Sequence, residues 1–103
     1  MNESFEVQLA GLRRKFCARA MAQSLDLEEI ISELEDGVAP ASGLREEIRR
    51  IAHSLAGGGG TFGFSELSAH ANEVGEFARS QPGRVELASA CRTLISEIKR
   101  AAR

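Results

Sequence analysis

Apolar residues recur at helical spacing through the first third of the chain. They stay within about 60° of one line at 3.6 residues per turn, which predicts one long helix over residues 5 to 36, or two helices in phase. Ser24 and Asp26, with Glu29 completing a capping-box pattern, mark the place where a break is expected. The apolar positions on this line are Phe5, Leu9, Leu12, Phe16, Ala20, Leu27, Ile30, Ile31, Leu34 and Val38.

Three further apolar stripes predict three further helices, separated by segments in which glycine and proline interrupt the pattern. The second helix is expected to start at Ser42 or Gly43, after the loop 37–43, and to run to about Gly58. The third is expected to start at Ser65 as its N-cap and to end at the loop 80–83. The inward positions are Leu44, Ile48, Ile51 and Leu55, then Leu67, Ala71, Val74 and Ala78, then Val85, Leu87, Leu94, Ile95 and Ile98.

No segment shows the alternation of apolar and polar residues that a strand requires. The fold class is therefore all-α, most simply an antiparallel up-and-down four-helix bundle with short loops. A chain of 103 residues, 43% of them hydrophobic, has enough apolar side chains for one modest core. We therefore expect a single domain over residues 1–103.

Charge and composition narrow the class of protein. The formal net charge of −2 does not favour a nucleic-acid-binding or membrane-surface protein. No run approaches the roughly 18 apolar residues of a transmembrane helix, and the start MNESFEVQ lacks the features of a signal peptide. We expect a cytoplasmic monomer. Cys17 and Cys91 have no partner residues at metal-ligand spacing, so we interpret both as small apolar residues and expect no metal site.

One histidine lies on the side of the second predicted helix that faces away from the core. At about 100° per residue, Leu44, Ile48, Ile51 and Leu55 gather on one side of this helix and His53 falls on the other. The sequence therefore predicts that the imidazole is exposed. Its expected neighbours on that side are Glu46, Arg49, Arg50, Ala56, Gly57 and Gly60.

Four consecutive glycines, Gly57 to Gly60, follow the histidine. Because glycine costs roughly 1 kcal/mol relative to alanine inside a helix, either the helix ends there or another backbone comes close. The spacing Gly58, Gly60, Gly63 also has the form of a dinucleotide fingerprint, but that motif follows a strand, whereas a helix precedes it here.

The run from Ala52 to Gly57, followed by Thr61-Phe62-Gly63-Phe64 and by Leu67, Ala71 and Val74 at helical spacing, resembles the histidine-containing phosphotransfer (HPt) domain family. The resemblance implies a four-helix bundle that carries a phosphoryl group on an exposed histidine between aspartates of receiver domains in phosphorelays. The matching motif covers about a quarter of the chain. Family members often have lysine where this chain has Ala56, and glutamate where it has Gly75.

The resemblance assigns the phosphoryl-acceptor role to His53. Near pH 7 an ordinary imidazole is largely neutral, and a neutral ring nitrogen is a nucleophile. The resemblance also implies that a receiver domain and a sensor histidine kinase are the partners. The receiver would supply an aspartate cluster, Mg²⁺ and a lysine, and this chain would need no cofactor of its own. Arg49 and Arg50, one turn before the histidine, are candidates for the cation that Ala56 does not provide.

Other interpretations remain open. The chain could be a helical adaptor that binds a signalling partner through the glycine-rich face without being phosphorylated. It could also be a fragment of a kinase dimerisation region, which would leave a self-complementary apolar stripe exposed after the bundle forms, but the sequence shows no such stripe that the core does not need. The second histidine, His70, lies about 60° off the centre of its apolar stripe, which indicates a residue at the edge of the core.

Overall fold

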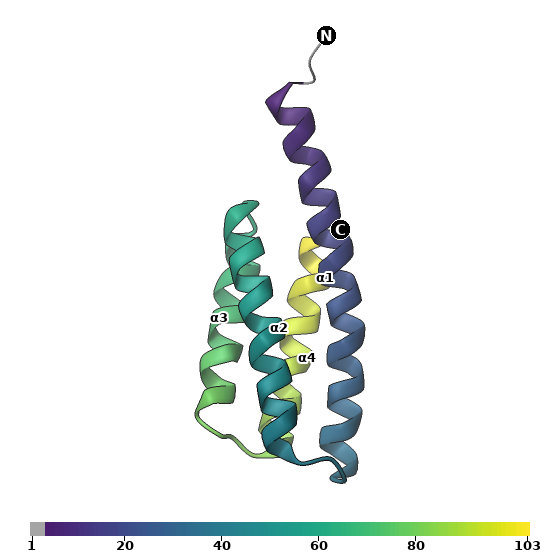
Figure 1. Cartoon of the computed structure of the whole chain (residues 1–103), viewed down its shortest axis with the longest axis vertical. Helices are drawn as coiled ribbons and strands as arrows, with labels where there is room; N and C mark the ends of the chain where they lie inside the picture. The colour runs from purple at the N-terminus through teal and green to yellow at the C-terminus, as the bar shows by residue number, and fades with distance from the viewer. Residues whose placement is uncertain (1–3) are drawn as a thin grey trace.

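Residues 4–103, the part of the chain that the computed structural model describes, form four α-helices joined by short loops (Figure 1). The helices are α1 (Phe5–Asp36), α2 (Ala41–Thr61), α3 (Ser65–Arg79) and α4 (Arg84–Ala101). Each helix packs against the helix before and after it, α1 also packs against α4, and successive helices run in opposite directions. The predicted fold class, an antiparallel up-and-down four-helix bundle, is confirmed. The predicted domain also included residues 1–3, which lie outside the described residues.

The first helix is continuous over its 32 residues, so the break considered near residue 24 does not occur. The side chain of Ser4 accepts a hydrogen bond from the backbone N–H of Val7 at 3.2 Å and caps the start. Ser24 is buried inside the helix, where its hydroxyl donates to the carbonyl of Met21 at 2.6 Å. Gly37 ends the helix in the left-handed conformation, with φ 73°, which glycine adopts without steric cost.

The N-terminal turns of α1 extend beyond the ends of the other helices (Figure 1). Phe5 and Leu12 are therefore 76% and 48% exposed, although they lie on the same apolar line as the buried Phe16. The apolar line therefore does not lead to burial in these turns, nor at Val38, which lies in the loop after α1. The prediction that Val85 points inward is wrong, because this residue is exposed in the first turn of α4.

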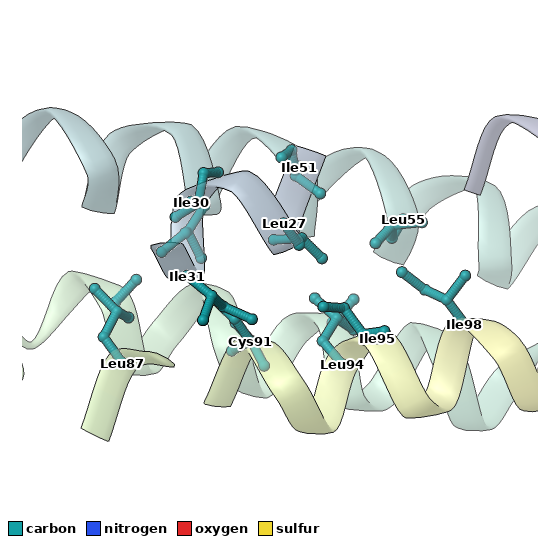
Figure 2. Packing of buried hydrophobic residues seen from close by; sticks show 14 of the residues in the cluster. Leu27, Ile30, Ile31, Ile51, Leu55, Leu87, Cys91, Leu94, Ile95 and Ile98 are labelled. Atoms are coloured by element: carbon teal, nitrogen blue, oxygen red, sulfur yellow. The ribbon is translucent and has the colours of Figure 1, made fainter. Parts of the chain in front are cut away.

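The core lies along the common length of the four helices. Figure 2 shows buried side chains of α1, α2 and α4 converging on the interior of the bundle, and α3 contributes the four apolar positions that were predicted. The positions labelled there are Leu27, Ile30, Ile31, Ile51, Leu55, Leu87, Cys91, Leu94, Ile95 and Ile98. Within residues 4–103, none of the helices combines the length and apolar character that crossing a membrane requires.

Arg84, at the start of α4, closes the end of the bundle where α1 finishes. Its guanidinium donates to the carbonyls of Glu33 and Leu34, each at 3.2 Å, and to the carbonyl of Ala39 in the following loop. The last carbonyls of a helix have no partner within the helix. Arg84 therefore supplies a partner for the carbonyl of Leu34, adds a second donor to that of Glu33, which also accepts from the N–H of Gly37, and joins α4 to α1.

Candidate functional site

His53 lies on α2, and its ring is exposed, as the helical phase predicted. The residues on the opposite side of the same turns, Ile51 and Leu55, are fully buried in the core. The helix is thus anchored by one face while the imidazole projects from the other. This arrangement leaves the ring nitrogens accessible to another molecule.

The helix continues through all four glycines to Thr61, so the predicted end near Gly58 is wrong. It also starts slightly earlier than predicted, at Ala41 rather than at Ser42 or Gly43. The alternative explanation of the glycines, a close approach of another backbone, is confirmed at Gly59, where a Cβ would lie 3.2 Å from the carbonyl oxygen of Phe64. At Gly58 the close neighbour is a side chain instead, since a Cβ there would lie 2.5 Å from the ring of Phe16.

The glycine-rich end of α2 is fixed to α3 and α1 by polar and aromatic contacts. The hydroxyl of Ser68 on α3 donates to the carbonyl of Ala56 at 2.8 Å. Arg13 on α1 donates through Nε to the carbonyl of Phe62 at 2.8 Å. The ring of Phe16 packs against the rings of Phe62 and Phe64, with centroids 5.8 and 5.5 Å apart. The turn after the histidine helix is therefore held rigidly against the bundle.

A cleft of about 340 Å³ opens beside His53, between α2 and α3. Its floor is made of small residues: a Cβ at Gly75 on α3 would lie 3.5 Å from the Cβ of Ala52 on α2. Polar and charged side chains line both walls. They are Glu46, Arg49, Arg50 and His53 on α2, and Asn72, Glu76 and Arg79 on α3.

The arginines of the cleft differ in their partners. Arg49 forms an ion pair with Glu46, with 2.9 Å between Nη1 and Oε2. Within residues 4–103, the side chains of Arg50 and Arg79 have neither a hydrogen bond nor an ion pair, so their donors face solvent. Arg50 and Arg79 are therefore the cations that an anion entering the cleft would meet without competition from an internal carboxylate.

The structure brings some of the predicted site residues together and separates others. Glu46, Arg49 and Arg50 share the cleft with His53. Ala56, Gly57 and Gly60 lie further along α2, where Gly57 and Gly60 are exposed and Ala56 is partly covered by α3. The α3 wall was not predicted, because the sequence does not reveal which positions of two antiparallel helices face each other.

The second histidine occupies a different environment. His70 is half-buried at the edge of the core, and its Nε2 lies 3.6 Å from Oε1 of Glu97 on α4. This placement agrees with the interpretation of His70 as a residue at the edge of the core. It also gives the chain two histidines in clearly different settings, one solvent-exposed in a cleft and one packed between helices.

The cysteines lie on helix faces. Cys91 is fully buried in the core, and burial raises the pKa of its thiol from the ordinary 9.0 to about 12, while the charge of Arg92 lowers it slightly. Cys17 is half-buried, and both thiols are free. In the described part of the chain, no group of three or more histidine, cysteine, aspartate or glutamate side chains is placed to hold a metal ion.

Comparison with known families supplies one match. The model of a family described as the Hpt domain matches residues 11–101. The matched span contains the whole cleft and His53. No curated protein and no solved structure matches the chain.

Proposed function

Because this chain belongs to the Hpt domain family, we propose that His53 accepts a phosphoryl group from one signalling partner and passes it to another. Hpt domains are phosphocarrier modules of two-component signalling rather than catalysts, and they interact with receiver and kinase domains. That general role holds for this chain. The acceptor residue, the partners and the route of transfer are the proposal.

The observation that carries the proposal is the position of His53 on the wall of a cationic cleft. The ring is exposed, and three arginines line the same cleft. His70, by contrast, is half-buried next to the carboxylate of Glu97. A partner protein can therefore bring a phosphoryl group to His53 without disturbing the core.

The proposed step is a reversible displacement at phosphorus. One nitrogen of the neutral imidazole attacks the phosphorus of an aspartyl phosphate on a receiver domain, and the other nitrogen keeps its proton. The N–P bond forms while the bond from phosphorus to the carboxylate oxygen breaks, and its electron pair leaves with the aspartate. Passing the group on to a second receiver reverses these changes. A kinase that carries the phosphoryl group can serve as the first donor instead.

Most of the catalytic power in this proposal comes from the partner. Phosphoryl transfer needs positioning and neutralisation of charge on the phosphoryl oxygens, typically by a metal ion and cationic side chains. We assign the metal ion, expected to be Mg²⁺, and a lysine to the receiver. The chain itself contributes the nucleophile, nearby arginines and a docking face that consists of Glu46, Ala56, Gly57 and Gly60. A cytoplasmic location and a monomeric state belong to the same proposal.

Transfer of labelled phosphate from phosphorylated receiver domains tests the proposal. A panel of receivers, phosphorylated with a small acyl phosphate, is mixed with the wild-type chain, with His53→Gln and with His70→Gln. We expect acid-labile label on the wild type and on His70→Gln but none on His53→Gln. The substitution at the exposed position should change stability by no more than about 0.5 kcal/mol, which circular dichroism and urea unfolding check.

Two results would contradict the proposal. Label retained on His53→Gln would assign the acceptor to another residue. Tight binding of a phosphorylated receiver without any transfer of label to the wild type would favour the adaptor interpretation instead.

A further inference from the structure

Arg79 stands on the opposite wall of the cleft from the helix that carries His53. It follows Gly75 by four residues, so the two share one face of α3. Gly75 marks the place where α3 comes closest to α2, because a Cβ there would touch the Cβ of Ala52 at 3.5 Å. His53 is the next residue after Ala52. The shared cleft therefore connects a cation of α3 with the imidazole of α2.

The charge balance of the cleft depends on this residue. Three arginines and two glutamates line it, so its formal charge is +1 with neutral histidine. Arg49 and Glu46 are already paired with each other at 2.9 Å. The remaining charged side chains of the cleft are the cations Arg50 and Arg79 and the anion Glu76. Without Arg79 the cleft would carry no net positive charge, whereas a phosphoryl group brings a charge of about −1.5 to −2 near neutral pH.

No cation follows His53 on α2, because residues 54–61 contain neither lysine nor arginine. Ala56, one turn after His53, is uncharged, and its carbonyl accepts the hydroxyl of Ser68. Arg13, on α1, is already bound to the carbonyl of Phe62. A guanidinium is well suited to phosphoryl oxygens, because its planar fork of donors forms paired, charge-assisted hydrogen bonds.

We propose that Arg79 binds the phosphoryl group on His53 from the neighbouring helix and neutralises part of its charge. This inference rests on the proposed acceptor role of His53. In the phosphorylated chain, Arg79 on α3 and Arg50 on α2 bind the phosphoryl oxygens from the two walls of the cleft. The phosphoryl group then bridges the two helices. The energetic effect is to stabilise the phosphorylated form of the chain relative to the phosphorylated receiver.

The test is the equilibrium distribution of label between this chain and a receiver that labels the wild type. We compare Arg79→Ala, Arg79→Lys and the matched control Arg19→Ala, which removes the same charge from an exposed position on α1. A solvated ion pair is worth up to about 1 kcal/mol, which corresponds to about fivefold in an equilibrium constant. We expect Arg79→Ala to shift the distribution toward the receiver by up to about fivefold at low salt. Arg79→Lys should restore part of the shift, and Arg19→Ala should match the wild type.

The equilibrium distribution separates neutralisation of the phosphoryl group from a role in docking or folding. A residue that only helps the receiver to dock changes the rate of transfer in both directions but leaves the distribution unchanged. The melting temperature of the unphosphorylated variants checks that the fold is intact. If Arg79→Ala and Arg19→Ala both show the wild-type distribution at low salt, the inference is overturned while His53 remains the acceptor. A wild type that takes no label at His53 would instead overturn the proposed function itself.

Discussion

Gly58 lies directly beneath the ring of Phe16, where a Cβ would stand 2.5 Å from Cε1 and 2.7 Å from Cδ1. The ring is itself confined, because it is buried and packs against Phe62 and Phe64. The aromatic side chain of α1 thus occupies the volume that a side chain at position 58 would need. This contact explains why glycine, although it weakens a helix, occupies position 58.

The contact predicts opposite effects of alanine at two neighbouring glycines. Gly58→Ala should destabilise the bundle by a net amount of up to about 2 kcal/mol, because overpacking of a confined ring costs about 1 to 3 kcal/mol and outweighs the gain of about 1 kcal/mol in helix propensity. Gly57→Ala is the control, since nothing lies within 4 Å of a Cβ at that position. It should stabilise the chain by up to about 1 kcal/mol. Urea unfolding of both variants measures the difference, and equal stability of the two would contradict the assigned contact.

Gly57→Glu should block phosphoryl transfer without unfolding the chain. Gly57 is exposed one turn after His53, so a glutamate there has room within the bundle but projects where the receiver must approach. Its charge would also repel the acidic pocket expected in a receiver. The measurement is the rate of transfer, and circular dichroism checks folding. Gly57→Ala is the control, because it adds only an uncharged methyl group and should still transfer. Normal transfer by Gly57→Glu would show that docking uses another face.

The two arginines of α2 that line the cleft should differ in their contributions. Arg49 is paired with Glu46, whereas Arg50 has no internal partner within residues 4–103. Arg50→Ala should therefore slow transfer by several-fold, with a smaller effect of Arg49→Ala, since each solvated contact is worth about 1 kcal/mol or less. The double variant should lose more, and Ala56→Lys should restore part of the loss in that background. A double variant as fast as the wild type at low salt would assign all neutralising charge to Arg79 and the partner.

The arginine pairing gives a further test through Glu46. Glu46→Gln removes the carboxylate that holds Arg49 and leaves a side chain of the same size. The freed guanidinium should then favour the phosphorylated chain by up to about fivefold in the equilibrium distribution of label. The double variant Glu46→Gln, Arg49→Ala is the control, because it should lose most of the gain. An unchanged distribution in Glu46→Gln would mean that Arg49 does not reach the phosphoryl group.

Cys91 should make the stability of the bundle fall at alkaline pH. Its thiol has a pKa of about 12 in the folded chain, raised by burial from the ordinary 9.0. Between these values the unfolded chain loses the thiol proton and the folded chain keeps it. The free energy of unfolding therefore decreases as pH rises above about 9, by roughly 1 kcal/mol per pH unit. Urea unfolding between pH 8 and about 10.5 measures this slope, and Cys91→Ala should lack the part due to the thiol. The same slope in both proteins would contradict the assignment.

The spacing of apolar residues predicted the helices and the side of each that faces the core. It did not predict which turns of a helix are covered by a neighbouring helix. Phe5 and Phe16 occupy equivalent positions on one line, and only Phe16 is buried. The period records which side of a helix is apolar, whereas burial also requires a neighbouring helix at that height. The turns around Phe5 extend past the other helices, so the same pattern leads to exposure there.

The candidate site was predictable only on the helix that carries the histidine. Helical phase placed His53, Arg49 and Arg50 on one exposed face, and in the structure all three line the same cleft. Arg79 was missed because its position depends on the axial register of α3 against α2. That register is set by tertiary contacts, such as those of Gly59 with Phe64 and Gly75 with Ala52, which no periodicity encodes.

The two opposite faces of α2 have different roles: one packs in the core and stabilises the bundle, and the other carries the side chains that a partner would contact. Ile48, Ile51 and Leu55 hold the bundle together, while the side chains beside His53 point into solvent and carry almost none of the packing. Substitutions at Glu46 or Arg50 can therefore change the charge that a partner meets at little cost to folding. Such a helix can acquire a preference for a different receiver in single steps, each of which yields a folded protein.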